Sequence, residues 1–470
     1  MTKYKKTAIA RAHTPKKTMW DFIHSHTHIK SINEKTIAYS VLSVFILYVL
    51  AYAVITKFTF TWDFSWWALT MLPLIFVIDG VKGVGAVFKR KKVTGIEDSS
   101  KITFVIPCYN GEDTIETVII NILRRFNRKQ IIVVSNGSVD GTVNICKKYP
   151  VKLVEIKEGV GKERAIQAGL ALVETPYVVT MDDDTLINDA VIPTSLLDEG
   201  YGAVGFRVLP EPGNWVIDIQ NHEYMRSMDV GKQNANHDGS VDCVSGAICL
   251  ISKEELLRQG DLHTKEFSGE DLQRTLHIHL SGASKGVVLC DSTVYTFVPD
   301  TIGMLFRQRI FGWFPGLYAN LNLFLKILFA RHTSLSMRYT AVYNVFLVVF
   351  MDLIRVITLP LIIFHPPTFI AMSVIYFILD NIVYFSMKEK SRYWILLIGP
   401  VYGIFGLMTR LAAMSVFMYR RSVYHLKQAE YLDDHKQAPF WMRSATVTGI
   451  LAIFAGYFSM AMTLKSMGIW

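Results

Sequence analysis

The chain has 470 residues, of which 51% are hydrophobic and 19% are charged, and its formal net charge is +9. A soluble enzyme of this length would normally carry more charge, and the length exceeds one ordinary compact domain. The apolar residues gather towards both ends and leave a polar middle, which predicts a soluble domain inserted in a membrane protein. Because the basic residues cluster beside the hydrophobic runs, we interpret them as topology signals and expect no nucleic-acid partner.

The N-terminal part predicts a tail followed by a membrane hairpin. Residues 1–35 are basic and polar, without the pattern of a cleavable signal peptide, and we expect a cytosolic tail. Residues 36–88 contain two hydrophobic stretches separated by tryptophans that are typical of a membrane interface. The first stretch is long enough to cross a bilayer core of roughly 30 Å. The basic run KRKK follows the second stretch, so the middle of the chain should be cytosolic.

From 100 to 301 the pattern changes to that of a folded α/β domain. Short runs rich in β-branched residues (ITFVIP, QIIVVS, VKLVEI, YVVTMD) alternate with helical patterns such as TIETVIINILRRF and KERAIQAGLALVE. This alternation predicts a parallel sheet with helices on its faces. Ligands of such sheets bind at the carboxyl ends of the strands.

The five cysteines lie in this middle part, and none forms a CxxC pair. An odd number without metal-ligand spacing argues against a disulfide framework or a zinc site. We therefore expect buried, reduced thiols in a cytosolic compartment.

The C-terminal part predicts further membrane association. Residues 302–333 mix aromatic residues, arginines and Pro or Gly breaks, which favours interfacial amphipathic helices. The C-terminal transmembrane region, 337–468, contains hydrophobic runs near 338–364, 367–387, 393–418 and 445–467. We expect six spans in total. Five is the alternative, because with six spans the basic loop 419–444 would be extracellular and would break the positive-inside tendency.

The strongest chemical signal is the run Asp182-Asp183-Asp184-Thr185 at the end of a predicted buried strand. Closely spaced carboxylates are costly unless a divalent cation neutralises them. Mg²⁺ or Mn²⁺ bridging a diphosphate is the natural partner. The plain alternative is an acidic turn that follows a strand.

Two other predicted strands end in polar segments. The first ends in Pro107-Cys108-Tyr109-Asn110-Gly111-Glu112, and the second in Ser135-Asn136-Gly137-Ser138. Asn136 could bond a base or a ribose, although Asn-Gly also satisfies a tight turn.

These strand ends, together with Gly161-Lys162 and Ala165 to Gly169, occur in an order that resembles the family 2 glycosyltransferases, whose nucleotide-binding sheet is of the type called GT-A. The resemblance covers about residues 100–316. It implies a uridine diphosphate sugar as donor and Mn²⁺ or Mg²⁺ on Asp184 and Asp182. The nucleotide-sugar contacts that it implies are Pro107, Tyr109, Asn110, Glu112, Asn136, Lys162, Asp182, Asp183, Arg307, Gln308 and Arg309.

Further segments resemble the membrane synthases of this family. Glu223-Tyr224 resembles their "EY" helix, and the segment from Cys243 through Ser245 to Gly246 resembles the C-x-S-G strand on the acceptor side in hyaluronan and chitin synthases. Gly269-Glu270-Asp271 resembles the GED motif, which implies that Asp271 is the catalytic base with Glu270 beside it. The other interpretation of Asp271 is a helix N-cap.

One segment departs from the family pattern. Processive synthases carry Gln-x-x-Arg-Trp, whereas this chain has Gln308-Arg309-Ile310-Phe311-Gly312-Trp313, with no arginine before the tryptophan and one residue more. Arg307 or Arg309 could take over the diphosphate contact. Trp313 is either a platform under the acceptor sugar or an interfacial anchor.

Together with the resemblance, the sequence therefore predicts a metal-dependent, inverting hexosyltransferase, with a GT-A-type α/β domain in an α-helical multi-pass protein of the plasma membrane. The expected product is a β-linked polysaccharide exported through the protein's own channel, as the likeness to hyaluronan synthase implies. The alternative is a non-processive enzyme that adds one sugar to a lipid or short acceptor. The partners are the donor, a carbohydrate acceptor and membrane lipids. A pure transporter is the third interpretation, but no repeat between the two membrane regions supports it.

Overall fold

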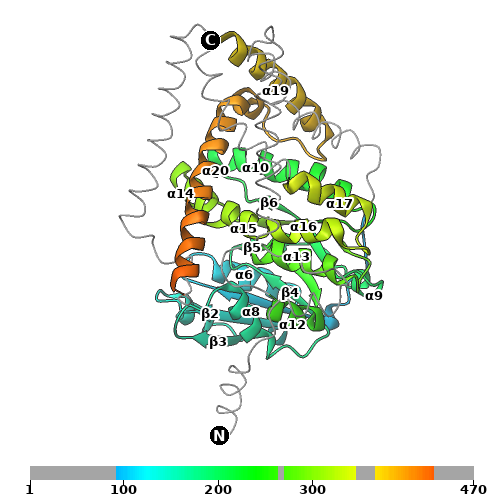
Figure 1. The fold of residues 1–470 in the computed structure, drawn as a ribbon. Helices are drawn as coiled ribbons and strands as arrows, with labels where there is room; N and C mark the ends of the chain where they lie inside the picture. Colours follow the sequence, from blue (N-terminus) through cyan, green and yellow to red (C-terminus); the bar gives the residue numbers. More distant parts are fainter. Residues whose placement is uncertain (1–91, 263–268, 346–365, 428–470) are drawn as a thin grey trace. The chain divides into compact units, whose positions relative to one another are not determined.

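The computed structural model describes residues 92–262, 269–345 and 366–427 of the chain (Figure 1). The chain divides into two compact units, Met1–Trp62 and Asp63–Trp470, and all the described residues belong to the second. The predictions for 1–35, 36–88 and 445–467 lie outside the described residues, as does most of the run 338–364.

The central element is an eight-stranded sheet in the order β3-β2-β1-β4-β7-β6-β8-β5. The strands are β1 Ile102–Cys108, β2 Ile131–Asn136, β3 Lys152–Ile156, β4 Tyr177–Met181, β5 Thr185–Leu186, β6 Ala203–Pro210, β7 Ile248–Ser252 and β8 Val287–Thr296. The four strand runs recognised in the sequence are β1 to β4, which pair in parallel as predicted.

The prediction of a wholly parallel sheet is wrong for the other half. Strand β7 runs antiparallel to β4 and to β6, and β5 runs antiparallel to β8, while β6 and β8 are parallel. The excursion between β6 and β7 starts and finishes at the same end of the sheet, so β7 must run back along β6. This brings the loop before β7 to the end of β4, where the Asp182 backbone N–H donates to the Ala247 carbonyl at 2.9 Å.

The core of the domain forms between this sheet and the helices on its faces. Every residue of β1 and β2 is buried, as expected for strands that are covered on both sides. Helices α6 Ile115–Leu123 and α8 Lys162–Leu170 follow the first and third strands, close to their predicted positions, and α8 packs on β1 and β2. The domain also contains the short helices α7 Thr142–Cys146 and α9 Ser195–Asp198, and the longer α12 Lys253–Leu262. All five cysteines are free, and four of them are buried as expected, whereas Cys243 is half-buried.

The remaining helices belong to the half of the chain that follows β6. They are α10 Trp215–Met225, the π-helical η4 Arg226–Lys232, α11 Gln233–Ala235, α13 Glu270–Ser281, α14 Ile302–Gln308, the π-helical η5 Arg309–Trp313, α15 Phe314–Ala319, α16 Leu321–Phe329, α17 Leu335–Val342, α19 Pro366–Ser386 and α20 Trp394–Lys427. The segment expected to be interfacial, 302–333, forms α14 to α16, which pack against α13 and α20.

Within the ranges that the structure describes, no helix combines the length and the apolar character needed to cross a membrane. The runs 367–387 and 393–418 do form helices, α19 and α20, but they are not supported as spans. The middle of α19 carries Asp380, which is buried and receives a hydrogen bond from Arg226 on η4 at 3.2 Å.

Candidate active site

The loops after β1 and β2 bind each other through residues that the sequence assigned to the donor. The backbone N–H of Val139 donates to Asn110 Oδ1 at 2.9 Å, and that of Gly141 donates to Glu112 Oε2 at 2.7 Å. Asn110 has a positive φ of 52°, which asparagine tolerates better than most residues. Asn110 and Glu112 therefore shape this edge of the sheet. They follow the buried Pro107 near the end of β1 and the half-buried Tyr109.

Asn136 at the end of β2 is buried, and its Oδ1 accepts a hydrogen bond from the Val160 backbone N–H at 2.8 Å. The next residue, Gly137, has a φ of +80°, and a Cβ there would lie 2.4 Å from the Gly159 backbone nitrogen. Both observations show Asn136 in the turn role that the sequence left open, holding the loop that leads into α8.

The three carboxylates follow β4 and are half-buried. Burial raises the pKa of Asp182 to about 7 and the pKa of Asp183 and Asp184 to about 6, and repulsion among the carboxylates adds to the effect. Asp184 Oδ1 accepts from the Thr296 hydroxyl at 3.0 Å. The negative charges of this run are therefore costly where they stand.

A divalent cation would relieve this cost. Among the described residues no group of three or more His, Cys, Asp or Glu side chains could hold a metal ion. Mg²⁺ is commonly bound by only one or two carboxylates, with substrate phosphates completing the coordination. Asp182 and Asp184 fit that role through the chemistry of their oxygens.

Lys162 connects these carboxylates to the predicted catalytic pair. Its Nζ lies 2.6 Å from Asp182 Oδ1 and 2.9 Å from Glu270 Oε1, and it donates to the Gly246 carbonyl at 3.2 Å. Burial opposes the charge on Lys162, but Asp182 and Glu270 outweigh it and raise the pKa of the ammonium group. In the same way Lys162 overcomes burial and lowers the pKa of Glu270 to about 2. Glu270 and Lys162 are thus a charged pair.

Asp271 lies beside this pair, in the first turn of α13. Its Oδ2 accepts from the Gly246 backbone N–H at 2.8 Å and lies 3.8 Å from the Cys243 thiol, while Oδ1 accepts from the Leu272 backbone N–H at 2.8 Å. Burial, together with the charge of Glu270, raises the pKa of Asp271. The helix begins at Glu270 and its N-cap is Gly269, so the N-cap interpretation of Asp271 is wrong.

The segment from Cys243 to Gly246 is a loop that precedes β7, so the expected strand is wrong for these residues. Gly246 touches both sides of the site, because a Cβ there would lie 3.2 Å from Asp271 Oδ2 and 3.2 Å from Lys162 Nζ. Ser245 is half-buried next to it.

The extra residue in the segment after Gln308 is absorbed by the π turn η5. Residues four apart share a face of an α-helix, and a π turn contains one residue more. Gln308 and Trp313, five positions apart, are therefore brought towards one face, as residues four apart would be in an ordinary helix. The π turn thus compensates for the extra residue in the position of Trp313 relative to Gln308.

Arg309 supports Trp313 from behind. Its guanidinium carbon lies 3.5 Å from the centroid of the Trp313 ring, and its Nη2 lies 2.6 Å from Glu223 Oε2. Arg309 is buried, whereas Trp313 is 45% exposed and Arg307 is exposed. A diphosphate contact by Arg307, Gln308 or Arg309 stays a prediction, and the described contacts of Arg309 are with Glu223 and Trp313.

With this geometry in view, a comparison with known families is decisive for the central domain. The family described as "Glycosyl transferase family 2" matches residues 103–255. Residues 103–255 are a family 2 glycosyltransferase domain. The match covers β1 to β7, and with them the carboxylates, Lys162 and Gly246 of this glycosyltransferase domain.

Curated relatives are similar to part of the chain. Poly-β-1,6-N-acetyl-D-glucosamine synthase of Staphylococcus aureus (strain MSSA476) is 28% identical over 240 residues, which are 48% of this chain and 57% of that protein. The synthase of the same name from Staphylococcus epidermidis is 28% identical over 229 residues, or 46% and 54%. The chain thus spans little more than half the length of the curated relatives it matches.

Two solved structures are similar to the glycosyltransferase at low identity. Mannosyltransferase PcManGT from Pyrobaculum calidifontis, in complex with GDP-Man and Mn²⁺, is 17% identical with a TM-score of 0.44, covering 76% of this chain and 100% of that one. S. aureus TarS 1–349 in complex with UDP-GlcNAc is 14% identical with a TM-score of 0.38, covering 68% and 92%.

Sequence reasoning missed several residues that hold the glycosyltransferase site together. Glu223 was noted only as part of a motif, yet it binds Arg309 and also accepts from the Tyr402 hydroxyl of α20 at 2.9 Å. Glu163 and Arg274 form a buried ion pair behind Lys162. No local signal marks Tyr402, whereas a glutamate directly after the Gly-Lys pair could have prompted a search for its partner.

Proposed function

We propose that the domain transfers a hexose from a UDP-sugar to a carbohydrate hydroxyl with inversion at the anomeric carbon. The observation that carries the proposal is the position of Lys162, which bonds Asp182 at the end of β4 and Glu270 next to Asp271. A donor diphosphate beside Asp182 and an acceptor hydroxyl beside Asp271 would therefore share one small site. The family match and the names of the curated relatives support the same reaction class.

Each residue has a chemical role in this proposal. Asp271 removes the proton from the acceptor hydroxyl as that oxygen bonds to the anomeric carbon. The bond from this carbon to the diphosphate oxygen breaks, and its electron pair leaves with the nucleotide. Lys162 lies where it can stabilise the charge that develops on the leaving group. Glu270 keeps Lys162 charged and oriented. Attack from the face opposite the leaving group converts an α-linked donor into a β-linked product.

The proposal includes a divalent metal ion, Mn²⁺ or Mg²⁺, on Asp182 and Asp184. When bound, the ion would neutralise the diphosphate and these carboxylates together. The raised pKa values of both carboxyls support it, since they indicate negative charge in need of a counter-ion.

A growing β-linked polysaccharide is the acceptor that we propose, exported through the protein's own membrane region. The relatives named poly-β-1,6-N-acetyl-D-glucosamine synthase make UDP-N-acetylglucosamine the first donor to test. The exposed ring of Trp313, backed by Arg309, offers a flat surface for an acceptor sugar. The second candidate, addition of a single sugar, is favoured by the engagement of Arg309 with Glu223 instead of the site.

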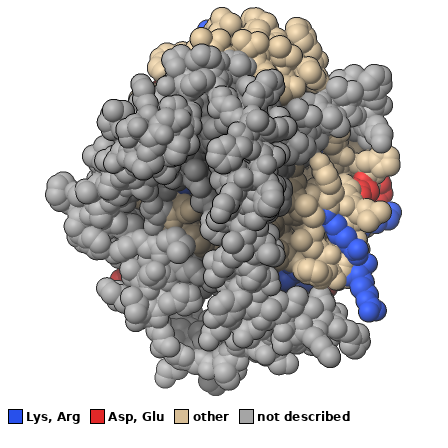
Figure 2. Space-filling view, turned by 45° about the horizontal axis from the view of Figure 1, so that its top comes forward, with Lys and Arg blue, Asp and Glu red and all other residues tan. Residues whose placement is uncertain are grey.

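Insertion in the plasma membrane, with the catalytic domain on the cytosolic side, is part of this proposal. The sequence supports it through its hydrophobic runs, and α19 adds an exposed apolar stripe at a spacing of four residues, formed by Ile370, Val374, Ile378 and Ile382. Figure 2 shows a face on which most visible described atoms belong to uncharged residues, with the largest group of charged side chains at the right and a few charged atoms elsewhere.

The test is turnover by the purified full chain in nanodiscs with Mn²⁺ and a panel of nucleotide sugars. Nucleotide release and product size are read together, with Asp271→Asn beside the wild type. We expect release from one UDP-sugar, and a loss of about 100- to 10,000-fold in the variant. A long polymer supports the synthase and a single addition supports the second candidate. Absence of release with every donor from folded protein would overturn both.

A further inference from the structure

The two helices that carry Lys162 and Asp271 start next to each other without side-chain caps. Helix α8 begins at Lys162 after Gly161, and α13 begins at Glu270 after Gly269. Both glycines have positive φ, 84° and 100°, and glycine has no side chain with which to cap a helix. The relative position of these helix starts must therefore be fixed by contacts elsewhere.

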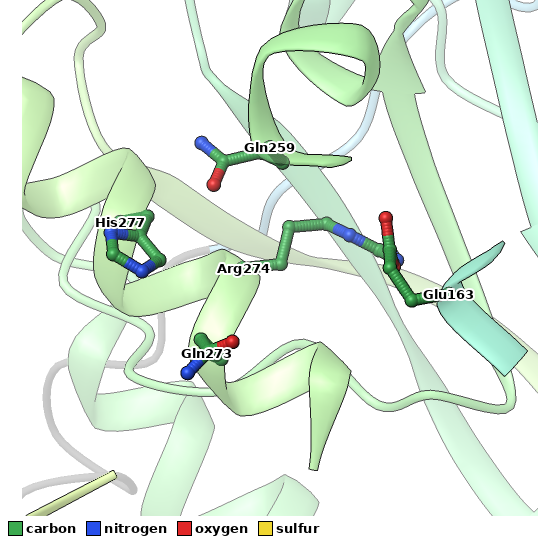
Figure 3. A pocket seen from close by; sticks show the side chains of 5 residues that line it. All are labelled: Glu163, Gln259, Gln273, Arg274 and His277. Atoms are coloured by element: carbon green, nitrogen blue, oxygen red, sulfur yellow. The ribbon is translucent and has the colours of Figure 1, made fainter. Parts of the chain in front are cut away.

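One such contact lies directly behind the site. Glu163 of α8 and Arg274 of α13 form an ion pair with an Nη2–Oε2 distance of 2.7 Å, and their side chains are only 4% and 6% exposed. Figure 3 shows Arg274 extending from its helix towards Glu163, with Gln259, Gln273 and His277 around the same small pocket. The second oxygen of Glu163 accepts from Gln167 Nε2 at 2.9 Å. The pair joins α8 to α13 within a turn or two of their functional residues.

Stability alone does not account for this pair. Removing two charges from water costs several kcal/mol per ion, and apolar side chains of similar volume often serve stability equally well or better. Arg274 remains charged, because the charge of Glu163 outweighs burial and raises its pKa. A buried pair with a fixed length and direction does, however, define where two helices lie relative to each other.

A second contact holds α13 through Gln273, the residue before Arg274. Gln273 Nε2 donates to Asn320 Oδ1 at 3.0 Å, and Asn320 Nδ2 donates to the Gly316 carbonyl at 2.8 Å. A Cβ on Gly269 would lie 3.0 Å from Gly316 Cα, so the start of α13 also sits close against α15. The helix that carries Asp271 is thus held by two separate sets of contacts, and Glu163–Arg274 is its connection to α8, which carries Lys162.

We propose that Glu163 and Arg274 are positioning residues, which set the distance of Lys162 from Glu270 and Asp271 and so align the donor side with the base. The inference rests on the proposed glycosyl transfer for its kinetic test and has a second, activity-independent test. Displacements of about 1 Å in a site can cost about 100-fold in rate.

The decisive variant replaces both charges, Glu163→Leu with Arg274→Met. We expect it to melt at or above the wild-type temperature, to bind UDP with Mn²⁺ as the wild type does, and to lose about 10- to 100-fold in kcat with little change in the donor KM. The matched control is Arg207→Met with Asp229→Leu, because this ion pair is equally buried, at 3% and 1% exposure, and joins β6 to η4. The control should keep the wild-type kcat. Arg274→Lys, which keeps the charge, should recover part of the rate.

The second measurement does not depend on turnover. Reductive methylation of Lys162, followed by mass spectrometry, reports how firmly the ammonium group is held between Asp182 and Glu270. Its rate should rise severalfold in the double variant and stay unchanged in the control. Wild-type protein without turnover would overturn the proposed function, while faster methylation would still support the positioning role. Wild-type kcat together with wild-type methylation in the double variant would overturn the positioning role itself.

Discussion

The two halves of the site are held in place by different means. On the donor side, Asp182 and Asn110 follow strand ends and Asn136 is the last residue of β2, and each of them bonds the backbone of a neighbouring loop. On the acceptor side, Asp271 and Trp313 stand on helices, which are joined by bonds between side chains far apart in sequence. The sheet register already fixes a strand end, whereas a helix can slide or rotate unless specific contacts prevent it.

The acceptor side consequently extends far beyond the matched family region. Glu223 connects α10 to Arg309, 86 residues later, and to Tyr402 of α20, 179 residues later. Helix α20 is therefore a structural component of the acceptor side. Changes on the donor side should abolish donor binding, and changes on the acceptor side should alter transfer while leaving donor binding intact.

Apart from loss of the proposed base Asp271, the largest effect is expected on the donor side, from Asp184→Asn. Loss of a metal ligand should lower kcat/KM by about 100-fold or more and remove the dependence of UDP affinity on Mn²⁺. Calorimetry with UDP across a Mn²⁺ series measures this. Asp113→Asn removes an exposed carboxylate nearby and serves as the control. Unaltered Mn²⁺ dependence in Asp184→Asn would show that the ion is bound elsewhere.

On the acceptor side, Glu223→Gln should have a smaller and different effect. The amide cannot balance the buried Arg309, so Trp313 loses its fixed support, and transfer to the acceptor should fall by about 10-fold. UDP affinity should not change, and donor hydrolysis should increase relative to transfer. Product-length analysis beside UDP release measures the ratio.

Tyr402→Phe tests the contribution of α20 to the same unit and should reduce transfer by about threefold. Tyr393→Phe is its control, because that hydroxyl bonds Asn381 at 2.9 Å, away from Glu223. Equal effects of the two tyrosine variants would indicate that α20 supports the fold in general and not Glu223 in particular.

The same comparison explains what the sequence revealed. Strand runs, the acidic run and the Gly-Lys pair are local patterns, and they gave the first four strands, α8 and the donor-side residues. The π turn η5 was visible in the sequence only as one extra residue between Gln308 and Trp313, because no residue type is specific to a π turn. The partners of Glu223, Glu163 and Arg274 could not be predicted, since they depend on the packing of helices that local patterns do not specify. The antiparallel direction of β7 was missed because strands that alternate with helices along the sequence normally run parallel in the sheet.

The close approach of α13 and α15 predicts a moderate effect for Gly269→Ala. The backbone of an alanine there would have to keep the φ of +100°, and its Cβ would lie 3.0 Å from Gly316 Cα. The variant should lose about 1–3 kcal/mol of unfolding free energy and part of its kcat. Gly303→Ala is the control, because nothing lies within 4 Å of its Cβ position and alanine favours a helix. Denaturant unfolding of both variants measures the difference, and equal stabilities would argue against the tight contact.

The smallest expected effect concerns stability against pH, and its sign differs between the two sides. On the donor side, folding raises the pKa of Asp182 and Asp184 from 3.8, so the metal-free protein should lose stability as pH rises from about 4 through about 6 to 7. On the acceptor side, burial lowers the pKa of His279 in α13 below 6.5, although Asp242 and Asp238 oppose the shift. His279 is then protonated at a higher pH in the unfolded chain than in the folded chain, so stability falls as pH drops below about 6.5.

These opposing slopes can be separated by substitution. Asp182→Asn with Asp184→Asn should flatten the loss of stability between pH 5 and about 7. His279→Gln, whose amide can still donate to the Val241 carbonyl that His279 contacts at 2.8 Å, should flatten the loss below about pH 6.5, by at most about 1.4 kcal/mol per pH unit. Thermal melting in chelator across this range measures both. If His279→Gln leaves the acid slope unchanged, other titratable groups dominate the stability in this pH range, and the burial of His279 contributes little to it.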